Sequence, residues 1–318
     1  MCGEHIGDSI AAPYETWSAK KIAEDIEARG GLMFFDYPDP WAKKGLEPEM
    51  FPAGRPTDDS DQTADLAWSL IQCNGLNVEH LREALRDSVV RGKSRLWSGV
   101  AKGAGGTTRK ALSDDPAKVA EAKQNNIGTN GSLMRCAPMA LWIHATKGGA
   151  IACYPEVEAM SRVTHNHPHS ISACHAYTAV LMAILNDNNK ESCLNAMQPG
   201  AGPNDLLPKR VALQLQDAHS YPYDPGAWPG RGSAEFSLYT ALWCFKHATS
   251  FSDGIEKAVR IGGDTDTYAA IAGGLLGAYY GYDAIPEDWR NAILGHNVMY
   301  DFAQTLLCGE LELQMSHV

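Results

Sequence analysis

The sequence predicts an all-α protein that forms one domain over residues 1–318. Apolar residues recur with the period of a helix along most of the chain. The chain has no convincing pair of alternating strands and no hairpin turn between two β-rich segments. Apolar helical segments flank every loop, and 44% of the residues are hydrophobic, which is ample for one large core.

The first strongly periodic segments are residues 62–72 and 78–90. From residue 62 onward, Leu66, Leu70 and Cys73 are spaced i, i+4 and i+7, and the second segment has apolar residues on one face with charges opposite. Further helices are expected at 131–145, 154–163, 169–187, 234–249, 252–260, 265–281, 286–297 and 299–307.

Three long loops are expected between these helices. They cover residues 36–61, 92–130 and 196–233. The last is the longest segment rich in Pro and Gly, and it also carries Tyr221, Tyr223 and Trp228. Aromatic residues in such a segment favour an ordered surface loop over a flexible linker.

The charge and the cysteines exclude several classes of protein. A net charge of −11 argues against non-specific binding to nucleic acids or anionic membranes. The eight cysteines form no C-x-x-C pair, and Cys73 and Cys244 lie in apolar helical patterns, which indicates reduced thiols. No signal peptide opens the chain and no apolar stretch is long enough to span a bilayer. We therefore expect a soluble, cytoplasmic protein without a membrane partner.

Residues 262–281 read GGDTDTYAAIAGGLLGAYYG, with Asp264 and Asp266 in front of a helical segment of small and apolar residues. Asp264 could be the N-cap of this helix, and Asp266 could lie in its first turn, where the helix dipole favours negative charge. Each glycine inside a helix costs about 1 kcal/mol relative to Ala, so the glycines indicate a central helix packed closely by others. Two carboxylates at its end require cations, and oxygen ligands suit Mg²⁺ or Ca²⁺.

Residues 55–70 read RPTDDSDQTADLAWSL and form a second acidic helix start. A capping box with a favourable first turn would explain one or two of these acids. The adjacent Asp58 and Asp59 repel each other unless a cation or separate solvation relieves them. Facing Asp264 and Asp266, they could supply ligands for two divalent ions about 3.5–4 Å apart, a common device in hydrolysis. Few His and no Cys lie nearby, so Mg²⁺ or Mn²⁺ fits better than Zn²⁺.

Three further segments carry polar groups suited to a site. Glu15 follows Pro13 in GEHIGDSIAAPYE (3–15) and is either a solvated loop acid or a member of the site. The Gly-rich segments GAGGTT (103–108) and GTNGSLMRCAPMAL (128–141) can present backbone N–H groups to a phosphate. Neither matches the P-loop pattern, so a nucleoside triphosphate is not the expected ligand.

Residues 164–170 read THNHPHS, in which three histidines alternate. Zinc needs a fixed spacing on a defined element, and Pro168 breaks the segment just before a helix, which argues against a zinc site. We interpret His165 as a hydrogen-bond donor to a ligand hydroxyl. His167 and His169 are expected to cap or solvate the start of the following helix.

The order of these motifs resembles that of the ADP-ribosylglycohydrolase family. The matching segments are GDSIAAPYE (7–15), TDDS (57–60), NGSLMR (130–135), Thr164-His165 and GGDTDTYAAIAGGLLGAYYG (262–281). They follow one another in the family's order, they span most of the chain, and the last motif is highly specific. Two features depart from the family: Ala11 stands where Gly is usual, and residues 227–236 differ in a loop near the acceptor group. The opening helix is also expected to be short.

The resemblance implies an all-α fold with a binuclear Mg²⁺ centre, for which Mn²⁺ could substitute, in a cleft that binds ADP-ribose. By motif position, the implied metal ligands are Thr57, Asp58, Asp59, Asp264, Asp266 and Thr267. The positions that contact pyrophosphate and ribose in the family correspond to Gly103, Gly105, Asn130, Gly131, Ser132 and His165. Glu15 matches the acidic residue near the scissile bond.

The implied activity is hydrolysis of the glycosidic bond at C1″ of ADP-ribose attached to a protein side chain. The metals would bind the 2″ and 3″ hydroxyls and position a water, with Glu15 as acid or base and a metal-bound water near Asp59 as the alternative.

A small ADP-ribose conjugate such as O-acetyl-ADP-ribose is a second substrate class. A metal-free helical binding module and a catalytically silent, crystallin-like member are the non-enzymatic alternatives, and the intact Asp pairs argue against the latter. The acceptor and the oligomeric state are left open by the sequence, with a monomer favoured.

Overall fold

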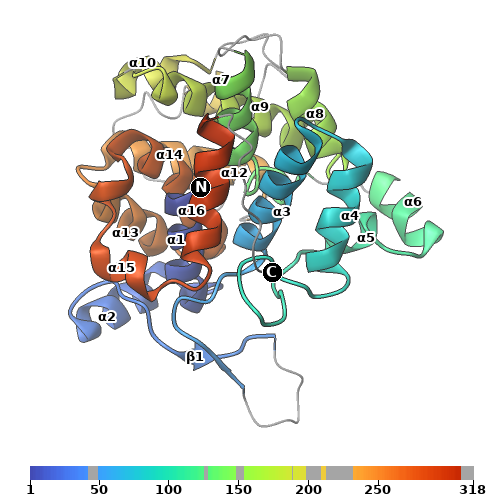
Figure 1. Ribbon diagram of the computed structural model, residues 1–318. Helices are drawn as coiled ribbons and strands as arrows, with labels where there is room; N and C mark the ends of the chain where they lie inside the picture. Colours follow the sequence, from blue (N-terminus) through green and yellow to red (C-terminus); the bar gives the residue numbers. More distant parts are fainter. Residues whose placement is uncertain are drawn as a thin grey trace.

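Helices make up most of the computed structural model (Figure 1), which describes residues 1–41, 49–124, 128–147, 154–187, 189–197, 209–212 and 232–308. In chain order they are α1 (Cys2–Ala11), η1 (Ala12–Tyr14), α2 (Ala19–Arg29), α3 (Asp58–Cys73), α4 (Val78–Val89), α5 (Gly106–Ala111), α6 (Pro116–Gln124), α7 (Ala137–Lys147), α8 (Tyr154–Arg162), α9 (Pro168–Leu185), α10 (Lys190–Asn195), α12 (Ala234–His247), α13 (Phe251–Ile261), α14 (Thr265–Tyr280), η3 (Tyr282–Ala284), α15 (Glu287–Ala292) and α16 (His296–Cys308). The predicted all-α class is confirmed.

Helix α14 lies in the interior, where it packs against α1, α9, α12 and α13. Residues 265–276 of this helix are all buried. A Cβ on Gly273 would lie 2.1 Å from the backbone oxygen of Gly3, and a Cβ on Gly7 would lie 2.0 Å from that of Ala269. Helices α1 and α14 therefore touch backbone to backbone, and the predicted role of the glycines in a central helix is confirmed.

Several helices were not expected from the sequence because they bury few apolar side chains. In α2 only Ile22 and Ile26 are buried, although Ser18 caps the helix by accepting from the N–H of Lys21 (3.3 Å) and Gly30 ends it at φ +79°. Helix α6 buries none of its residues, and α10 buries only Cys193. Helices α5 and α6 lie inside the segment 92–130 that was expected to be a loop.

Two expected helices are interrupted. The segment 131–145 begins with turns, and its helix α7 starts only at Ala137. The segment 286–297 divides into α15 and the start of α16, with Gly295 between them at φ +80°. A Cβ on Gly295 would lie 2.4 Å from the backbone oxygen of Leu96, so a close contact with another segment fixes this break.

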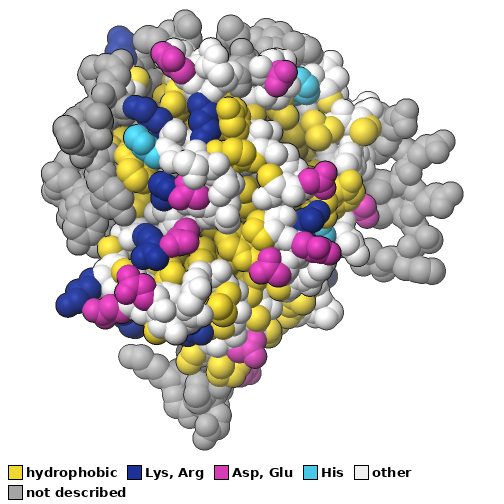
Figure 2. All heavy atoms as spheres, turned by 90° about the vertical axis from the view of Figure 1, so that its left-hand side faces the viewer, with side chains coloured by type: hydrophobic (Ala, Val, Ile, Leu, Met, Phe, Trp, Pro, Cys, Tyr) yellow, Lys and Arg dark blue, Asp and Glu magenta, His cyan; other side chains and the backbone are white. Residues whose placement is uncertain are grey.

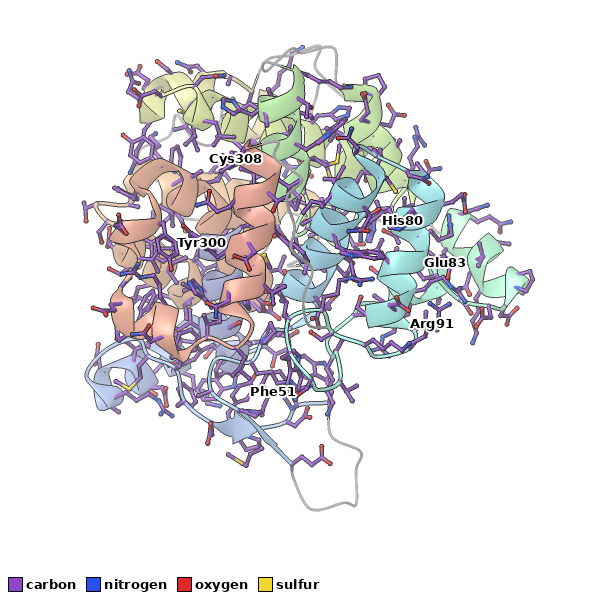
Figure 3. All side chains as sticks on the ribbon, in the orientation of Figure 1. Phe51, His80, Glu83, Arg91, Tyr300 and Cys308 are labelled. Atoms are coloured by element: carbon purple, nitrogen blue, oxygen red, sulfur yellow. The ribbon has the colours of Figure 1, made fainter. Side chains whose placement is uncertain are left out.

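A short strand pair lies in the segment 36–61, where no strand was expected. β1 (Tyr37–Pro38) pairs antiparallel with β2 (Met50–Phe51). Strands of two residues are too short to show an alternating pattern, which explains why the sequence does not reveal them. Tyr37 and Phe51 form a small apolar cluster with Ala12 of η1. Figure 3 shows Phe51 near the strand pair, in the lower part of the view. The pair therefore covers the segment that leads to Glu15.

The outer surface mixes charges of both signs. The face shown in Figure 2 carries basic and acidic side chains interspersed with hydrophobic ones. On α13, for example, Arg260 pairs with Glu256 at 2.7 Å. None of the helices in the described residues is both long and apolar enough to cross a bilayer. Tyr221, Tyr223 and Trp228 of the predicted surface loop lie outside the described residues.

Candidate metal centre

Three segments that are distant in sequence meet at one place: α1, the start of α3 and the start of α14. Thr57 is the N-cap residue of α3 and Asp264 is the N-cap residue of α14. Neither side chain makes the hydrogen bond that would cap its own helix. The N-cap interpretation of Asp264 is thus correct for its position but wrong for its side chain, which is directed to other partners.

Asp8 of α1 caps α3 from outside that helix. Its carboxylate accepts from the N–H groups of Thr57 (3.0 Å) and Ser60 (3.1 Å), from Thr57 Oγ1 (2.6 Å) and from Ser60 Oγ. The N–H of Ser60, at the third position of the helix, is one that an N-cap side chain usually satisfies. Asp8 is a site residue that the sequence analysis missed, although a lone acid in the apolar segment 6–12 was an available signal.

Carboxylate oxygens converge in two overlapping groups. One oxygen each from Asp8, Asp59 and Asp266 lie within 4.8 Å of one another, and the same is true of Glu15, Asp264 and Asp266. Asp266 belongs to both groups, so the two acidic turns and Glu15 form one continuous cluster. The structure therefore brings together acids that lie more than 200 positions apart in the sequence.

Burial and mutual repulsion raise the pKa of the carboxyl groups in this cluster. Burial, followed by repulsion from neighbouring acids, raises the pKa of Asp58 to about 8 and that of Glu15 to about 7. The pKa values of Asp59 and Asp266 are also raised, again by burial first and by nearby acids second. Acids in such proximity either share protons or share a cation.

The chemistry of the cluster fits a hard divalent cation. The side-chain atoms available as metal ligands are carboxylate and hydroxyl oxygens, which Mg²⁺ and Ca²⁺ prefer. Asp59 Oδ1 is buried and has no hydrogen-bond partner, which is costly for a carboxylate unless a cation compensates it. The buried Asp groups are thus consistent with a metal site.

Two threonines face the same cluster. Thr57 Oγ1 lies 3.3 Å from Asp59 Oδ2, and it also donates a hydrogen bond to Asp8 Oδ1. Thr267 donates its N–H to Asp266 Oδ1 (2.9 Å), and its side chain forms hydrogen bonds with Asp59 and Asp264. All six predicted metal ligands lie in or beside the cluster.

Asn130 joins the Gly-rich turn after residue 128 to the start of α14. Its Nδ2 donates to Asp264 Oδ2 (2.7 Å) and to Ser237 Oγ of α12 (2.9 Å). Thr265 Oγ1 donates to the backbone oxygen of Ala11 (3.1 Å), which fastens the same helix start to α1. Asp264 is thereby held from two sides.

Glycines allow two predicted ligand-binding loops to approach the cluster. Gly103 has φ +115°, and a Cβ there would lie 2.5 Å from Asp58 Oδ1. A Cβ on Gly131 would lie 2.8 Å from His165 Cε1 and 3.1 Å from Thr108 Oγ1. The loop 103–108, the turn at Asn130 and His165 thus lie side by side next to the acidic cluster.

Two other predicted substrate contacts have less specific surroundings. The Ser132 side chain is fully buried and its Oγ accepts from Ser161 Oγ (2.8 Å), so a ligand contact there would use the main chain. A Cβ on Gly105 would meet no heavy atom within 4 Å, and this residue is the N-cap of the short helix α5. The contacts described for these two positions involve no residue of the acidic cluster.

The other two histidines of the segment 164–170 lie at the start of α9. His167 is the N-cap residue, and its Nδ1 accepts from the N–H of His169 (3.1 Å). His169 Nδ1 lies 3.7 Å from Glu235 Oε2. The expected capping role of His167 is confirmed.

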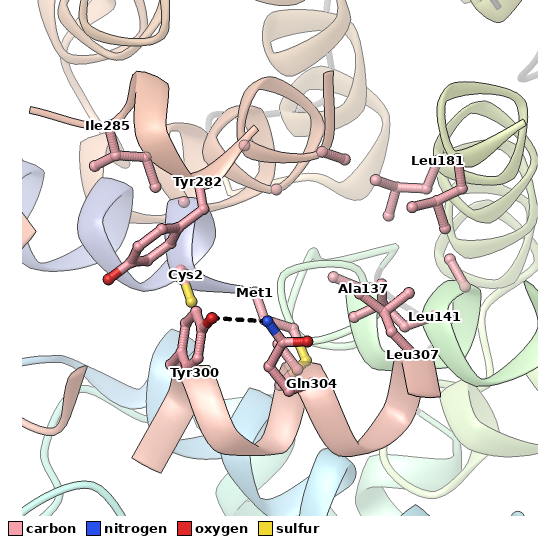
Figure 4. Close-up of a pocket in the computed structure, with 17 residues that line it drawn as sticks. Met1, Cys2, Ala137, Leu141, Leu181, Tyr282, Ile285, Tyr300, Gln304 and Leu307 are labelled. Carbon is pink, nitrogen blue, oxygen red and sulfur yellow. Dashed lines mark hydrogen bonds between the residues drawn. The ribbon is translucent and has the colours of Figure 1, made fainter. Parts of the chain in front are cut away.

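An apolar cavity lies toward the opposite end of α14. It has a volume of about 220 Å³, and residues of α1, α7, α9, α14 and α16 line it (Figure 4). Leu141, Leu181 and Ala278 are among its apolar lining residues, and its polar groups include Gln304 Nε2, which donates to the Tyr300 hydroxyl at 2.8 Å. This cavity contains none of the site residues that the sequence predicts.

Fold and site together define an all-α protein with a buried acidic centre suited to divalent cations. The chain belongs to the ADP-ribosylglycohydrolase family, whose sequence profile matches residues 1–315. It is 28% identical over 301 residues to the ADP-ribosyl-[dinitrogen reductase] glycohydrolase of Rhodospirillum rubrum, covering 92% of this chain and 87% of the relative.

Two further relatives and one solved structure agree with this assignment. ADP-ribosylarginine hydrolase Tri1 of Serratia proteamaculans is 25% identical, covering 96% of this chain and 77% of its own. ADP-ribosylhydrolase ARH3 of Bos taurus is 24% identical, covering 96% and 90%. A solved ADP-ribosylglycohydrolase-related protein complex superposes with a TM-score of 0.68 and 29% identity, covering 96% of this chain and 94% of the other. The resemblance inferred from the motifs is confirmed.

Proposed function

We propose that the protein is a Mg²⁺-dependent hydrolase that cleaves the glycosidic bond at C1″ of ADP-ribose attached to a protein side chain. The observation that carries this proposal is the pair of overlapping carboxylate groups built from α1, α3, α14 and Glu15. The family supports ADP-ribosylated compounds as the substrate class, since the relatives compared above are named as ADP-ribosyl hydrolases. Their names differ in the acceptor, so the acceptor cleaved by this protein needs its own test.

Two Mg²⁺ ions, or Mn²⁺ in their place, would be held by the two acidic helix starts. The proposed ligands are Thr57, Asp58, Asp59, Asp264, Asp266 and Thr267. When bound, such ions supply positive charge that orients the distal ribose and polarises water. Asp8 is proposed to support the site, since it fixes the turn that carries Thr57.

Glu15 is the proposed acid or base. It is partly exposed at the edge of the cluster, whereas Asp59 is 1% exposed. A carboxyl group at the edge can reach both the leaving group and water, so Asp59 suits the role of ligand better than that of acid or base. Hydrolysis of glycosidic bonds proceeds through oxocarbenium-like states, which the neighbouring carboxylates would stabilise.

The paired glycine loops support a place for the pyrophosphate and ribose groups. The loop 103–108 and the turn 130–132 lie next to the cluster, and His165 lies against Gly131. Backbone N–H groups of such loops suit phosphate oxygens. We propose that Gly103, Gly105, Asn130, Gly131, Ser132 and His165 contact these parts of the substrate.

The proposal is tested with the double variant Asp264→Asn/Asp266→Asn. We expect it to lose Mg²⁺-dependent release of ADP-ribose from a modified protein, because two of the six proposed ligands lose their charge. Asp253→Asn, on the surface of α13, is the matched control and should keep full activity because it lies outside the cluster. Undiminished turnover by the double variant would refute the assignment.

The acceptor is tested with a panel of substrates at fixed Mg²⁺. The panel contains a protein modified on arginine, a peptide modified on serine, and O-acetyl-ADP-ribose as the small conjugate. Release of ADP-ribose from the protein or peptide supports the proposed function. Turnover of the small conjugate alone would replace it with the metabolite hydrolase.

A further inference from the structure

A buried arginine organises the residues around His165. Arg135 is fully buried, and its Nη1 donates to Gln62 Oε1 (2.7 Å) and to the backbone oxygen of Gly131 (2.9 Å). Its Nη2 donates to Thr164 Oγ1 (2.7 Å). Thr164 Oγ1 in turn lies 2.8 Å from His165 Nδ1. One guanidinium therefore connects α3, the Gly-rich turn and the loop before α9.

The hydrogen of the Thr164 hydroxyl has one suitable acceptor. A guanidinium only donates, so Thr164 Oγ1 accepts from Arg135. Among the described residues, the other partner of this hydroxyl is His165 Nδ1. If Nδ1 carried a proton, the hydroxyl would accept two hydrogen bonds and its own hydrogen would have no partner, at a side chain that is 5% exposed. Leaving a buried donor unpaired is unfavourable, so the geometry requires Nδ1 to accept.

The doubly protonated imidazolium is disfavoured for an additional reason. Burial, followed by the charge of Arg135, lowers the pKa of His165 to about 3. At neutral pH the ring is therefore uncharged, with a single proton. Since Nδ1 accepts, that proton is on Nε2.

The Nε2 side of the ring faces the glycine loops. A Cβ on Gly131 would lie 3.0 Å from His165 Nε2, and the same Cβ would lie 3.1 Å from Thr108 Oγ1. Nothing larger than glycine fits there, so the turn at Gly131 packs directly against the ring edge that carries Cε1 and Nε2, with Thr108 on the same side. Nε2 therefore lies beside the two glycine loops to which the proposed function assigns the substrate contacts.

The same arginine reaches the acidic cluster. Because Gln62 Oε1 accepts from Arg135, the amide nitrogen of Gln62 points the other way, where it donates to Asp58 Oδ2 (2.5 Å). Asp58 is one of the proposed metal ligands. Arg135 thus holds the histidine and the start of α3 in a fixed relation.

We infer that Thr164, itself oriented by Arg135, fixes His165 as the neutral tautomer protonated on Nε2, so that the ring presents a hydrogen-bond donor to an acceptor oxygen of the bound ADP-ribose group. Thr164 and Arg135 are positioning residues, whereas His165 is the residue that touches the ligand. The identity of the ligand rests on the proposed function. The tautomer does not, and it can be measured without any ligand.

The tautomer is tested by long-range ¹H–¹⁵N correlation NMR of the protein labelled on histidine nitrogen. The variant His165→Gln identifies the His165 signals among the 11 histidines. We expect the wild-type protein and Thr164→Ser, which keeps the hydroxyl, to show a protonated Nε2 and an unprotonated Nδ1. Thr164→Val removes the hydroxyl at nearly the same volume and should lose this uniform pattern. A protonated Nδ1 in the wild type, or an unchanged pattern in Thr164→Val, would overturn the inference.

The consequence for the ligand is tested by calorimetric titration with ADP-ribose in the presence of Mg²⁺. Loss of one correctly placed hydrogen bond should weaken binding by Thr164→Val about threefold to tenfold, while Thr164→Ser binds like the wild type. Equal affinity of all three proteins would overturn the ligand contact. If the wild type binds no ADP-ribose, the proposed function fails, and the NMR measurement still decides the tautomer.

Discussion

The two ends of helix α14 are built for different purposes. At its start, Asp264 and Asp266 lie in a dense group of carboxylates, held by hydrogen bonds from Asn130 and Thr267. Toward its other end, Ala278 lines an apolar cavity of about 220 Å³. The positive end of the helix dipole favours the acids at the start. The comparison teaches that one closely packed helix supports a dense charge cluster at its start and leaves unused volume beside its last turns.

The largest effect is expected where α1 and α14 touch. Gly7→Ala would put a Cβ about 2.0 Å from the backbone oxygen of Ala269, and the two helices could not keep their distance. We expect the free energy of unfolding to fall by about 3 kcal/mol or more, together with loss of activity, since overpacking of a tight core costs about 1–3 kcal/mol even without a backbone clash. Chemical denaturation measures the change.

Gly105→Ala is the matched control for that variant. Its Cβ would meet no heavy atom within 4 Å, and its backbone has φ −66°, which alanine adopts readily. Its free energy of unfolding should change by less than about 1 kcal/mol. Equal stabilities of the two variants would show that the contact of α1 with α14 is not tight.

The second effect concerns Glu4 of α1, the helix that packs along α14 between its acidic start and the apolar cavity. Its Oε1 accepts from Thr63 Oγ1 (2.5 Å), its Oε2 is buried without a partner, and burial raises its pKa from the usual 4.5 to about 7. A raised pKa means that the folded protein binds the proton more tightly than the unfolded chain. Stability from this group is therefore fully present below about pH 4.5 and is lost as the pH rises through 7, by about 3 kcal/mol in total.

Glu4→Gln removes this titration and should reduce the loss of stability between pH 5 and pH 8. Thermal unfolding of both proteins across this range measures the difference. Glu79→Gln, at an exposed position of α4, serves as the control and should leave the pH dependence unchanged. Identical profiles for Glu4→Gln and the wild type would show that Glu4 is ionised at no cost.

The third effect isolates the acidic end. At a free Mg²⁺ concentration of 100 times the Kd, each bound ion should stabilise the wild-type protein by about 2.7 kcal/mol, because the ion binds the folded state alone. The double variant Asp264→Asn/Asp266→Asn should show no such gain, and Mn²⁺ should behave like Mg²⁺. The midpoint of thermal unfolding, followed through a titration of either ion, measures this. A metal-free helical binding module would show no gain in the wild type either.

The smallest effect is expected at the cavity end. Ala278→Leu would extend into unused volume and should raise the free energy of unfolding by about 0.5–1 kcal/mol. Ala272→Leu, two turns earlier in the same helix at a fully buried position, should lower it by about 1–3 kcal/mol. Urea denaturation of the pair gives the sign of each change. Opposite signs would support the contrast between the packed and the open part of α14, and equal losses would contradict it.

The sequence predicted the features that repeat along a helix or cluster in one short motif. The central position of α14 follows from its glycines, and the acidic helix starts follow from neighbouring aspartates that repel each other. The roles of Glu15 and of the six metal ligands stay predictions, as do a single domain over 1–318 and a cytoplasmic location.

Other features depend on contacts between distant segments, which local patterns do not encode. Asp8 was missed because its hydrogen bonds go to residues about 50 positions away. The strand pair at Tyr37 and Phe51 was missed because two residues show no period. The network from Asp58 through Arg135 to His165 was missed for the same reason, since its members come from three separate segments.

The cap that α1 provides for α3 has a consequence for how the chain reaches its native state. An isolated peptide of α3 lacks the carboxylate that satisfies its first N–H groups, so it should form little helix in water. The segment should become stable only after α1 docks, and the start of α14 is tied to the same place through Ala11. Contacts between segments this far apart form slowly, so the proposed cation site should be completed late in refolding.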